Sequence, residues 1–163
     1  MAAPRKSKRF TQSDPEPFGP PMVGALLRMP WEDVRRRMLE RLHEGGFDDL
    51  DAAHLGVFQY PGPQGARPSE LAARLRVSKQ ALNYQLGELE RLGYLERRAD
   101  PDDLRSKRVA LTRRGERAVR TIRDAVAEVE REWAERLGRA RFAQLLRLLR
   151  ELGDPPPPAR RSA

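Results

Sequence analysis

The chain has 163 residues, 39% of them hydrophobic, which supplies one ordinary core and argues against several independent domains. It contains no cysteine, which excludes a disulfide framework, a thiolate nucleophile and cysteine-based zinc or iron–sulfur sites. The net charge of +8 suits a nucleic-acid or anionic-lipid partner, and suits equally an arginine-rich proteome. Because no uncharged run approaches the ~20 apolar residues of a membrane helix, we expect a soluble, cytoplasmic protein with no membrane contact.

The two ends of the chain differ from its middle in composition. Residues 1–21 mix proline, serine and charge, with four basic residues among the first ten, and residues 154–163 contain a run of four prolines. We predict that both segments are disordered, and the simplest interpretation of each is a solvated arm without a role. The alternative for the basic N-terminal arm is a contact with phosphates that adds sequence-independent affinity. The middle divides into N-terminal helices over 22–60, a central unit over 61–112 and C-terminal helices over 113–153.

A first helix is predicted over Met22–His43, where apolar residues recur every three to four positions. Pro30 interrupts the pattern, because proline is tolerated best in a first turn. The helix therefore either starts again at Trp31 or is kinked there.

A shorter element follows the glycine pair at positions 45 and 46, which ends the first helix. Asp51 is a candidate N-cap for a short second helix that runs through His54 to Phe58. Residues 60–65 are rich in proline and glycine and predict a loop.

Two amphipathic helices come next, almost without a linker. They are predicted over Pro68–Leu75 and Ser78–Leu92, with Ser78 as the N-cap of the second. Only two residues separate them, so the helices must meet at a sharp angle, as in a helix-turn-helix. Their apolar faces comprise Leu71 and Leu75 on the first helix and Leu82, Leu86 and Leu89 on the second.

Residues 94–98 and 108–112 alternate between apolar and polar side chains on either side of the polar segment 100–107. This pattern predicts an antiparallel hairpin with an exposed tip. Thr112 then caps a long helix that Gly138 ends, and a second apolar stripe continues to Leu152. The central unit can cover only part of these long amphipathic helices, so we expect some of their apolar faces to meet another chain.

Five segments carry a resemblance through their order and spacing. They are Pro68–Leu75, Val77–Leu82, Leu89–Arg98, Asp100–Arg105 and Leu111–Gly115. Together they resemble the MarR family of bacterial transcription regulators, over roughly residues 22–153. The resemblance implies a mainly α fold with a small β-hairpin wing, in which a winged helix-turn-helix is flanked by N- and C-terminal dimerisation helices. It implies no cofactor and no enzymatic activity.

Three positions depart from the family pattern. Arg76 stands where a glycine is common in the inter-helix turn, so either a left-handed backbone there costs about 1 kcal/mol or the turn differs. Tyr84 replaces a common arginine or lysine, and Ala81 a common threonine. The last two leave the fold untouched but put the preferred base sequence in question.

The helix that starts at Ser78 is the predicted recognition helix. In a major groove its first two turns would present Ser78, Lys79, Gln80, Asn83 and Tyr84. Gln80 and Asn83 carry paired donor and acceptor groups that match adenine edges, Ser78 suits phosphate oxygens, and Lys79 suits either. The alternative for the same residues is a solvated polar face.

The hairpin tip supplies Arg105 and Lys107, and a guanidinium at such a tip can enter a narrow minor groove. The resemblance assigns Asp103 to bracing the wing and Arg105 to DNA contact, whereas the alternative is an exposed ion pair. Ser69 and Arg97 complete the candidate DNA-binding set. The acidic residues of the hairpin lack EF-hand spacing, so we expect no metal site.

The resemblance also implies an effector site. Family members often bind small aromatic or phenolic anions between the dimerisation helices and the winged helix-turn-helix, which we call the reading head (residues 61–112). The matching segments contain Trp31, Arg35, His54, Phe58 and Tyr60. Each of them has an alternative reading as a core or surface residue, and His54 as a buried structural histidine.

These inferences predict a homodimeric DNA-binding repressor that a small ligand releases from a near-palindromic operator, with recognition helices about 34 Å apart. The alternative is a winged-helix module that uses the same helix to bind protein and not specific DNA. We expect no enzyme, because His43 and His54 lie in different predicted helices without a paired carboxylate or a glycine-rich phosphate loop.

Overall fold

The computed structural model describes residues 20–59, 65–101 and 103–153, and the side chains of all of these except residues 59 and 103–105. The elements are α1 (Val23–Glu44), the 3-10 helix η1 (Val57–Gln59), α2 (Pro68–Leu75), α3 (Lys79–Arg91), β1 (Leu95–Asp100), β2 (Asp103–Leu111), α4 (Arg113–Leu137) and α5 (Arg139–Gly153). The predicted C-terminal tail, all but the last two residues of the predicted N-terminal arm, and Tyr60 lie outside the described residues.

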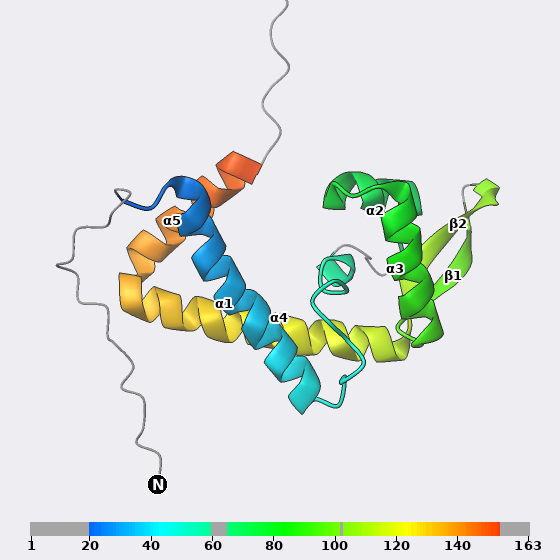
Figure 1. Cartoon of the computed structure of the whole chain (residues 1–163), viewed down its shortest axis with the longest axis horizontal. Helices are drawn as coiled ribbons and strands as arrows, with labels where there is room; N and C mark the ends of the chain where they lie inside the picture. Colours follow the sequence, from blue (N-terminus) through cyan, green and yellow to red (C-terminus); the bar gives the residue numbers. More distant parts are fainter. Residues whose placement is uncertain (1–19, 60–64, 102, 154–163) are drawn as a thin grey trace, which may run out of the picture.

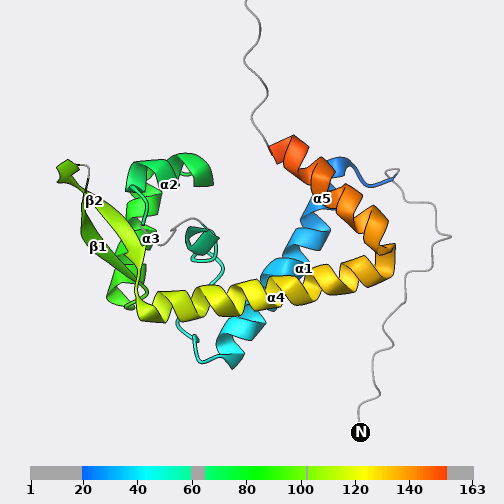
Figure 2. The same ribbon diagram turned by 180° about the vertical axis from the view of Figure 1, so that it is seen from behind.

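The predicted fold class is confirmed: the chain is mainly helical with one two-stranded antiparallel hairpin. Figure 1 shows α4 as a long strut that joins two separate groups of elements. At one end lie α2, α3 and the hairpin, and at the other lie α5 and the N-terminal half of α1. The view from behind shows the same arrangement, with η1 between the two groups (Figure 2).

The first helix is continuous at Pro30, where a new start or a kink was predicted. α1 runs through Pro30 and does not start again at Trp31. A proline lacks the amide hydrogen for one backbone hydrogen bond of the helix. The hydrogen bonds of the turns before and after Pro30 keep the helix continuous. The helix ends at Gly45, whose amide donates to the Arg41 carbonyl at 3.0 Å.

The predicted α-helix over residues 51–58 is wrong. The segment consists of consecutive turns followed by η1. Its backbone bonds join residues three apart, from the His54 amide to the Asp51 carbonyl and from the Val57 amide to the His54 carbonyl. The Asp51 carboxylate also accepts from the Ala53 amide at 2.8 Å, which favours a local turn over a helix.

The core lies where α3, the hairpin, η1 and the first half of α4 meet. Its largest completely buried side chain is Tyr94, whose ring packs edge-on against Phe58 at 5.8 Å and obliquely against Phe47 at 6.1 Å. Leu82, Leu86 and Leu89 of α3 are all fully buried, as predicted from their spacing.

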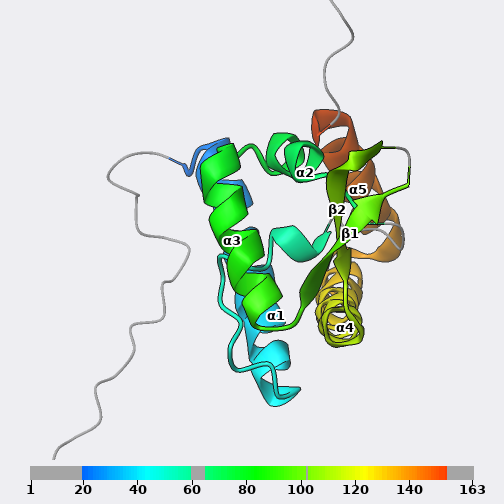
Figure 3. The same cartoon turned by 90° about the vertical axis from the view of Figure 1, so that its right-hand side faces the viewer.

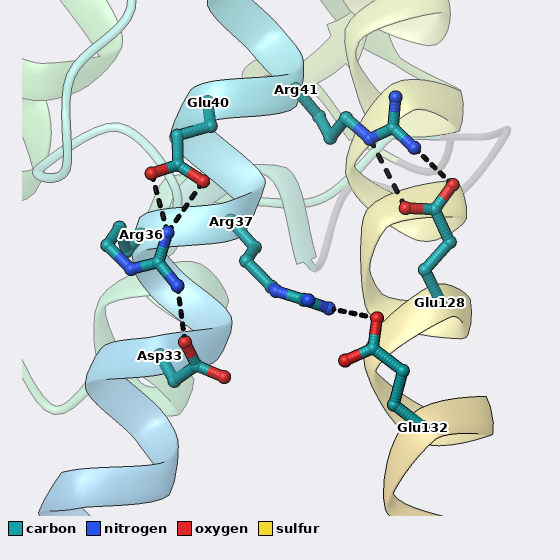
Figure 4. Close-up of polar contacts among 7 residues, drawn as sticks. All are labelled: Asp33, Arg36, Arg37, Glu40, Arg41, Glu128 and Glu132. Atoms are coloured by element: carbon teal, nitrogen blue, oxygen red, sulfur yellow. Dashed lines mark hydrogen bonds and ion pairs between the residues drawn. The ribbon is translucent and has the colours of Figure 1, made fainter.

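α1 and α4 cross with an apolar centre and a charged rim. Met38 and Leu42 of α1 belong to the buried core. Figure 4 shows the rim, in which Arg37 pairs with Glu132 at 2.7 Å and Arg41 with Glu128 at 2.5 Å. The hydrogen bond from Arg41 lowers the pKa of Glu128, so this pair is ionised over the whole physiological range. The two pairs flank the apolar contact between α1 and α4 and join the two helices at its edge.

The hairpin differs from its prediction in length. β1 extends to Asp100 and β2 begins at Asp103, so most of the predicted tip is strand, and the register shifts between Ala99 and Asp100. A third segment adds to the edge of β2, where Ala66 and Val109 exchange two backbone hydrogen bonds of 2.9 Å. Gly65 allows this close approach, because a Cβ there would lie 2.7 Å from the Val109 carbonyl oxygen.

The last two helices begin and end as predicted. The Thr112 hydroxyl caps α4 by accepting from the Gly115 amide at 3.1 Å, and Gly138 separates α4 from α5. Phe142 is buried, whereas Leu148, Leu149 and Leu152 of α5 are exposed. None of the helices that the structure describes combines the length and apolarity needed to cross a bilayer.

Candidate nucleic-acid interface

The turn between α2 and α3 is closed by two backbone hydrogen bonds. The Arg76 amide donates to the Ala73 carbonyl at 3.3 Å, and the Val77 amide to the Ala72 carbonyl at 3.2 Å. This is the Schellman pattern of a helix C-terminus, and it places Arg76 in the left-handed region at φ 53° and ψ 38°. Of the two alternatives for this turn, the left-handed backbone is the one observed. It carries an arginine where glycine would avoid a cost of about 1 kcal/mol.

α3, the predicted recognition helix, has one buried and one exposed face. Its N-cap is Ser78, whose hydroxyl accepts from the Ala81 amide at 3.1 Å. The exposed face carries Lys79, Gln80, Asn83 and Tyr84, and Tyr84 is 69% exposed. Among the described residues, none of these four side chains has a hydrogen-bond or ion-pair partner. The helix therefore presents unengaged polar groups to solvent.

α3 and the hairpin lie side by side at the end of the molecule away from α5 (Figure 3). An ion pair joins them, because Arg97 of β1 donates to both carboxylate oxygens of Glu90 on α3 at 3.0 Å. Arg97 is thus engaged within the protein. Lys107 of β2 and Ser69 in the first turn of α2 are exposed.

Asp100 holds the base of the wing in place. Its carboxylate is completely buried and accepts from Arg67 at 2.6 Å and from the Ser106 hydroxyl at 3.3 Å, and its other oxygen lies 3.0 Å from Nε of Arg108. A buried carboxylate is stable only when it is paired in this way. The expectation that Asp100 belongs to an exposed tip is wrong, because the register shift beside it turns its side chain inward.

Asp103 and Arg105 lie on β2, but their side chains are outside the described part of the structure. The bracing role of Asp103 and the DNA contact of Arg105 therefore stay predictions. Asp100, which sequence reasoning placed at the tip, is the brace that the described side chains show. Its partner Arg67 is 33 residues away, so no local pattern links the two.

A second polar cluster joins the reading head to α4. The Tyr94 hydroxyl donates to Asp49 at 2.5 Å, and Arg114 pairs with the same carboxylate at 2.9 Å while its guanidinium lies 4.4 Å from the centre of the Tyr94 ring. Arg114 also donates to the Leu92 carbonyl at 2.8 Å. The cluster therefore connects the segment after α1, the turn after α3 and the start of α4.

The ionisation of this cluster is fixed by its contacts. Partial burial acts to raise the pKa of Asp49, but the hydrogen bond from Tyr94 and the charge of Arg114 outweigh it and hold that pKa below its usual value. Burial and the neighbouring Asp49 carboxylate raise the pKa of Tyr94. Asp49 is thus ionised and Tyr94 protonated at neutral pH. Sequence reasoning missed this cluster, whose members are far apart in the chain.

The predicted effector residues do not form one described site. Trp31 is 45% exposed on α1, and Arg35 pairs with Glu32 on the same helix at 2.8 Å. His54 and Phe58 are buried in the core, each 4% exposed. Within the described residues, no hydrogen bond, ion pair or ring contact joins Trp31 or Arg35 to the two core residues.

His54 matches its alternative interpretation as a structural histidine. Its Nδ1 accepts from the Asp51 amide at 3.2 Å, and its Nε2 lies 3.6 Å from a carboxylate oxygen of Glu88 on α3. A polar groove of about 340 Å³ lies elsewhere, between the C-terminal part of α1 and α4. Its lining comprises Arg41, Glu44, Gly45, Thr121, Asp124, Ala125 and Glu128, none of which is a predicted effector residue.

Part of this chain matches the model of a known protein family. Residues 49–106 match the model of the MarR family. This match spans the turns after α1, the helix-turn-helix and most of the hairpin, which are the elements that form the exposed face described above. The winged helix-turn-helix of this chain is therefore similar to that of the MarR family.

Solved structures of MarR-family proteins resemble the whole described chain. A MarR-family transcription regulator is 25% identical over 80% of this chain and 82% of its own, with a TM-score of 0.63. Wild-type MarR from E. coli, in its apo form, is 27% identical over 80% of this chain and 96% of its own, with a TM-score of 0.60. CouR from Rhodococcus jostii, bound to p-coumaroyl-CoA, is 22% identical over 82% of this chain and 92% of its own, with a TM-score of 0.67. No curated protein sequence matches the chain significantly. The chain therefore has the fold of a MarR-family transcription regulator over nearly its full described length.

Proposed function

We propose that this MarR-family chain is a cytoplasmic, homodimeric repressor of transcription that binds a near-palindromic DNA operator. α3 reads the major groove, and the wing enters the adjacent minor groove. The observation that carries the proposal is the division of α3 into a fully buried leucine face and an outward face of unengaged polar side chains.

Base recognition is assigned to Gln80 and Asn83. Each amide offers a donor and an acceptor side by side, which matches N6 and N7 of adenine. Lys79 and the Ser78 end of α3 directly precede Gln80, about one turn before Asn83, and suit phosphate oxygens. Tyr84 is an exposed aromatic side chain, whose apolar edge suits a thymine methyl group.

The wing has a rigid base from which Arg105 and Lys107 can reach DNA. Asp100 ties β1 to Arg67 before α2 and to Arg108 on β2, and Arg97 ties β1 to Glu90 on α3, so the hairpin is held against the helix-turn-helix. A cation held at a fixed distance from a recognition helix can use the stronger negative potential of a narrow minor groove.

Dimerisation is supported by exposed apolar side chains on α1 and α5, which lie at the end of α4 away from the hairpin. Exposed large apolar residues on α1, its N-cap and α5 are Met22, Val23, Leu26, Leu27, Met29, Trp31, Leu148, Leu149 and Leu152. A monomer rarely leaves so many such groups in water. A two-fold pairing of this end leaves both winged units free, and it must place two α3 helices about 34 Å apart for them to enter successive major grooves.

Release by a small aromatic or phenolic ligand is the regulatory part of the proposal. Its support comes from fold neighbours, among them CouR bound to p-coumaroyl-CoA and S. aureus MepR bound to ethidium bromide. Such a ligand must favour one separation of the two reading heads over another, because equal affinity for both would shift nothing.

The test is selection of bound fragments from a pool of random duplexes, followed by binding measurements on three variants. Gln80→Ala and Asn83→Ala should each weaken binding to the selected duplex by roughly 1–3 kcal/mol and relax its sequence preference. Gln144→Ala on α5 removes the same kind of side chain from an exposed helical position and should bind like wild type. A selected near-palindrome bound by two chains supports the proposal. If no duplex is enriched or retained at low salt, the chain is instead a protein-interaction module.

A further inference from the structure

Arg76 is an exception in the backbone of this protein. Five described residues have positive φ, and the other four are Gly46, Gly65, Gly93 and Gly138. Elsewhere in the described chain, a left-handed position is therefore filled by the residue that adopts it without steric conflict. Only the turn between α2 and α3 places a β-carbon there.

Nothing within the described structure compensates for this conformation. The Arg76 side chain is exposed, and among the described residues it has no hydrogen-bond or ion-pair partner. The backbone bonds of the turn would form equally well with glycine, because they use the Arg76 amide and not its side chain. A strained residue that gains nothing inside the fold points to a role outside it.

The position of Arg76 indicates what that role is. It lies two residues before Ser78, the N-cap of α3, and three before the exposed Lys79. The left-handed turn fixes the direction in which the side chain leaves the backbone, at the end of α3 that the proposed function directs toward DNA. A guanidinium at such a point suits a phosphate, because it can donate two parallel hydrogen bonds to phosphate oxygens.

We propose that Arg76 binds a backbone phosphate of the DNA, and that the strain of the turn is retained for this contact. The inference rests on the proposed function and adds a contact that the helix-turn-helix would lack with glycine in the turn. Such a contact strengthens binding to every sequence and carries no base preference.

The experiment separates the charge of Arg76 from its backbone strain. Arg76→Gly removes both, Arg76→Gln removes only the charge, and Arg76→Lys keeps the charge. Arg141→Gln removes one charge from an exposed position on α5 and is the matched control. Each variant is measured for thermal unfolding and for binding to the selected duplex and to a scrambled duplex of the same length, over a series of salt concentrations.

Arg76→Gly should raise Tm by about 2–4 °C. It should nevertheless weaken binding to both duplexes by roughly three- to tenfold, and reduce the slope of log K against log salt by about 2, because each of the two chains of the dimer loses one phosphate contact. Arg76→Gln should show the same loss of binding and slope without the rise in Tm. Arg76→Lys and Arg141→Gln should keep the wild-type slope.

Two results would overturn the inference while leaving the proposed function intact. One is a wild-type slope and affinity for both Arg76→Gly and Arg76→Gln. The other is weakened binding by the glycine variant alone, which would show that the turn geometry matters and the charge does not. If the wild-type chain binds neither duplex, the proposed function fails and the Arg76 contact fails with it.

Discussion

The Tyr94 hydroxyl reaches across the core to the Asp49 carboxylate at 2.5 Å, and so joins the turn after the recognition helix to the segment that follows α1. The ring of Tyr94 is completely buried, but its hydroxyl meets an ionised group that is also bound by Arg114. One side chain thus supplies both core volume and a polar link between two parts of the fold.

Tyr94→Phe should lower the free energy of unfolding by about 1 kcal/mol, because it removes this hydrogen bond and keeps the packing of the ring. Arg114 still satisfies Asp49 in the variant, which limits the loss. Tyr84→Phe is the matched control, since Tyr84 is 69% exposed, and its stability should equal that of wild type. Denaturant unfolding measures both. Equal stability of the Tyr94 variant and wild type would show that the short bond contributes nothing.

Asp49 should make the protein lose stability in acid. Its pKa is lower in the folded than in the unfolded chain, where a carboxyl of this kind titrates near 3.9. The contribution is therefore fully present above the unfolded-state pKa and is lost as the pH falls from about 5 through the folded-state pKa. Asp49→Asn should flatten the fall in stability over that window, whereas Asp48→Asn, at the exposed neighbouring position, should not. Unfolding curves between pH 3 and 7 test this, and parallel losses in both variants would contradict it.

Gly115 should not tolerate alanine. It is buried in the first turn of α4, and a Cβ there would lie 2.2 Å from the Tyr94 carbonyl oxygen. We expect Gly115→Ala to destabilise the fold by about 1–3 kcal/mol, because the backbone must move to make room. Gly87→Ala is the control in α3, where the added methyl meets no atom within 4 Å and should stabilise the helix by about 0.5–1 kcal/mol. Thermal unfolding of the two variants should shift in opposite directions.

Asp100→Asn should loosen the wing. The substitution removes a completely buried negative charge and leaves Arg67 and Arg108 facing each other, at a cost of about 2–3 kcal/mol given that both arginines reach solvent. Asp124→Asn, on the exposed surface of α4, should have little effect on stability. Amide hydrogen exchange of β1 and β2 measures the local change. The idea fails if exchange in the hairpin is the same in Asp100→Asn as in wild type.

The elements that the sequence predicts well are those specified by local patterns. The leucines of α3 recur with helical spacing next to a serine cap, so both the helix and its buried face follow from neighbouring residues. The exposure of Gln80 and Asn83 follows from the same periodicity. The Thr112 cap and the glycine between α4 and α5 are equally local signals.

The features that the sequence does not predict depend on distant partners. Asp100 looks like a residue of an exposed tip until a register shift turns it toward Arg67, which belongs to a different element. The helix expected after Asp51 fails because side-chain bonds and the packing of His54 against α3 favour consecutive turns. The effector residues were inferred from resemblance alone, and the described contacts do not bring them together.

α4 is one uninterrupted helix of 25 residues and is therefore about 37 Å long. Arg114 and Gly115 bind its first turn tightly to the winged unit, and α5 follows its other end. A rigid rod of this length converts a tilt of about 5° at one end into a displacement of about 3 Å at the other. That displacement is close to the rise of one base pair, about 3.4 Å, so under the proposed function a slight rocking at the α5 end is enough to move α3 out of register with a groove.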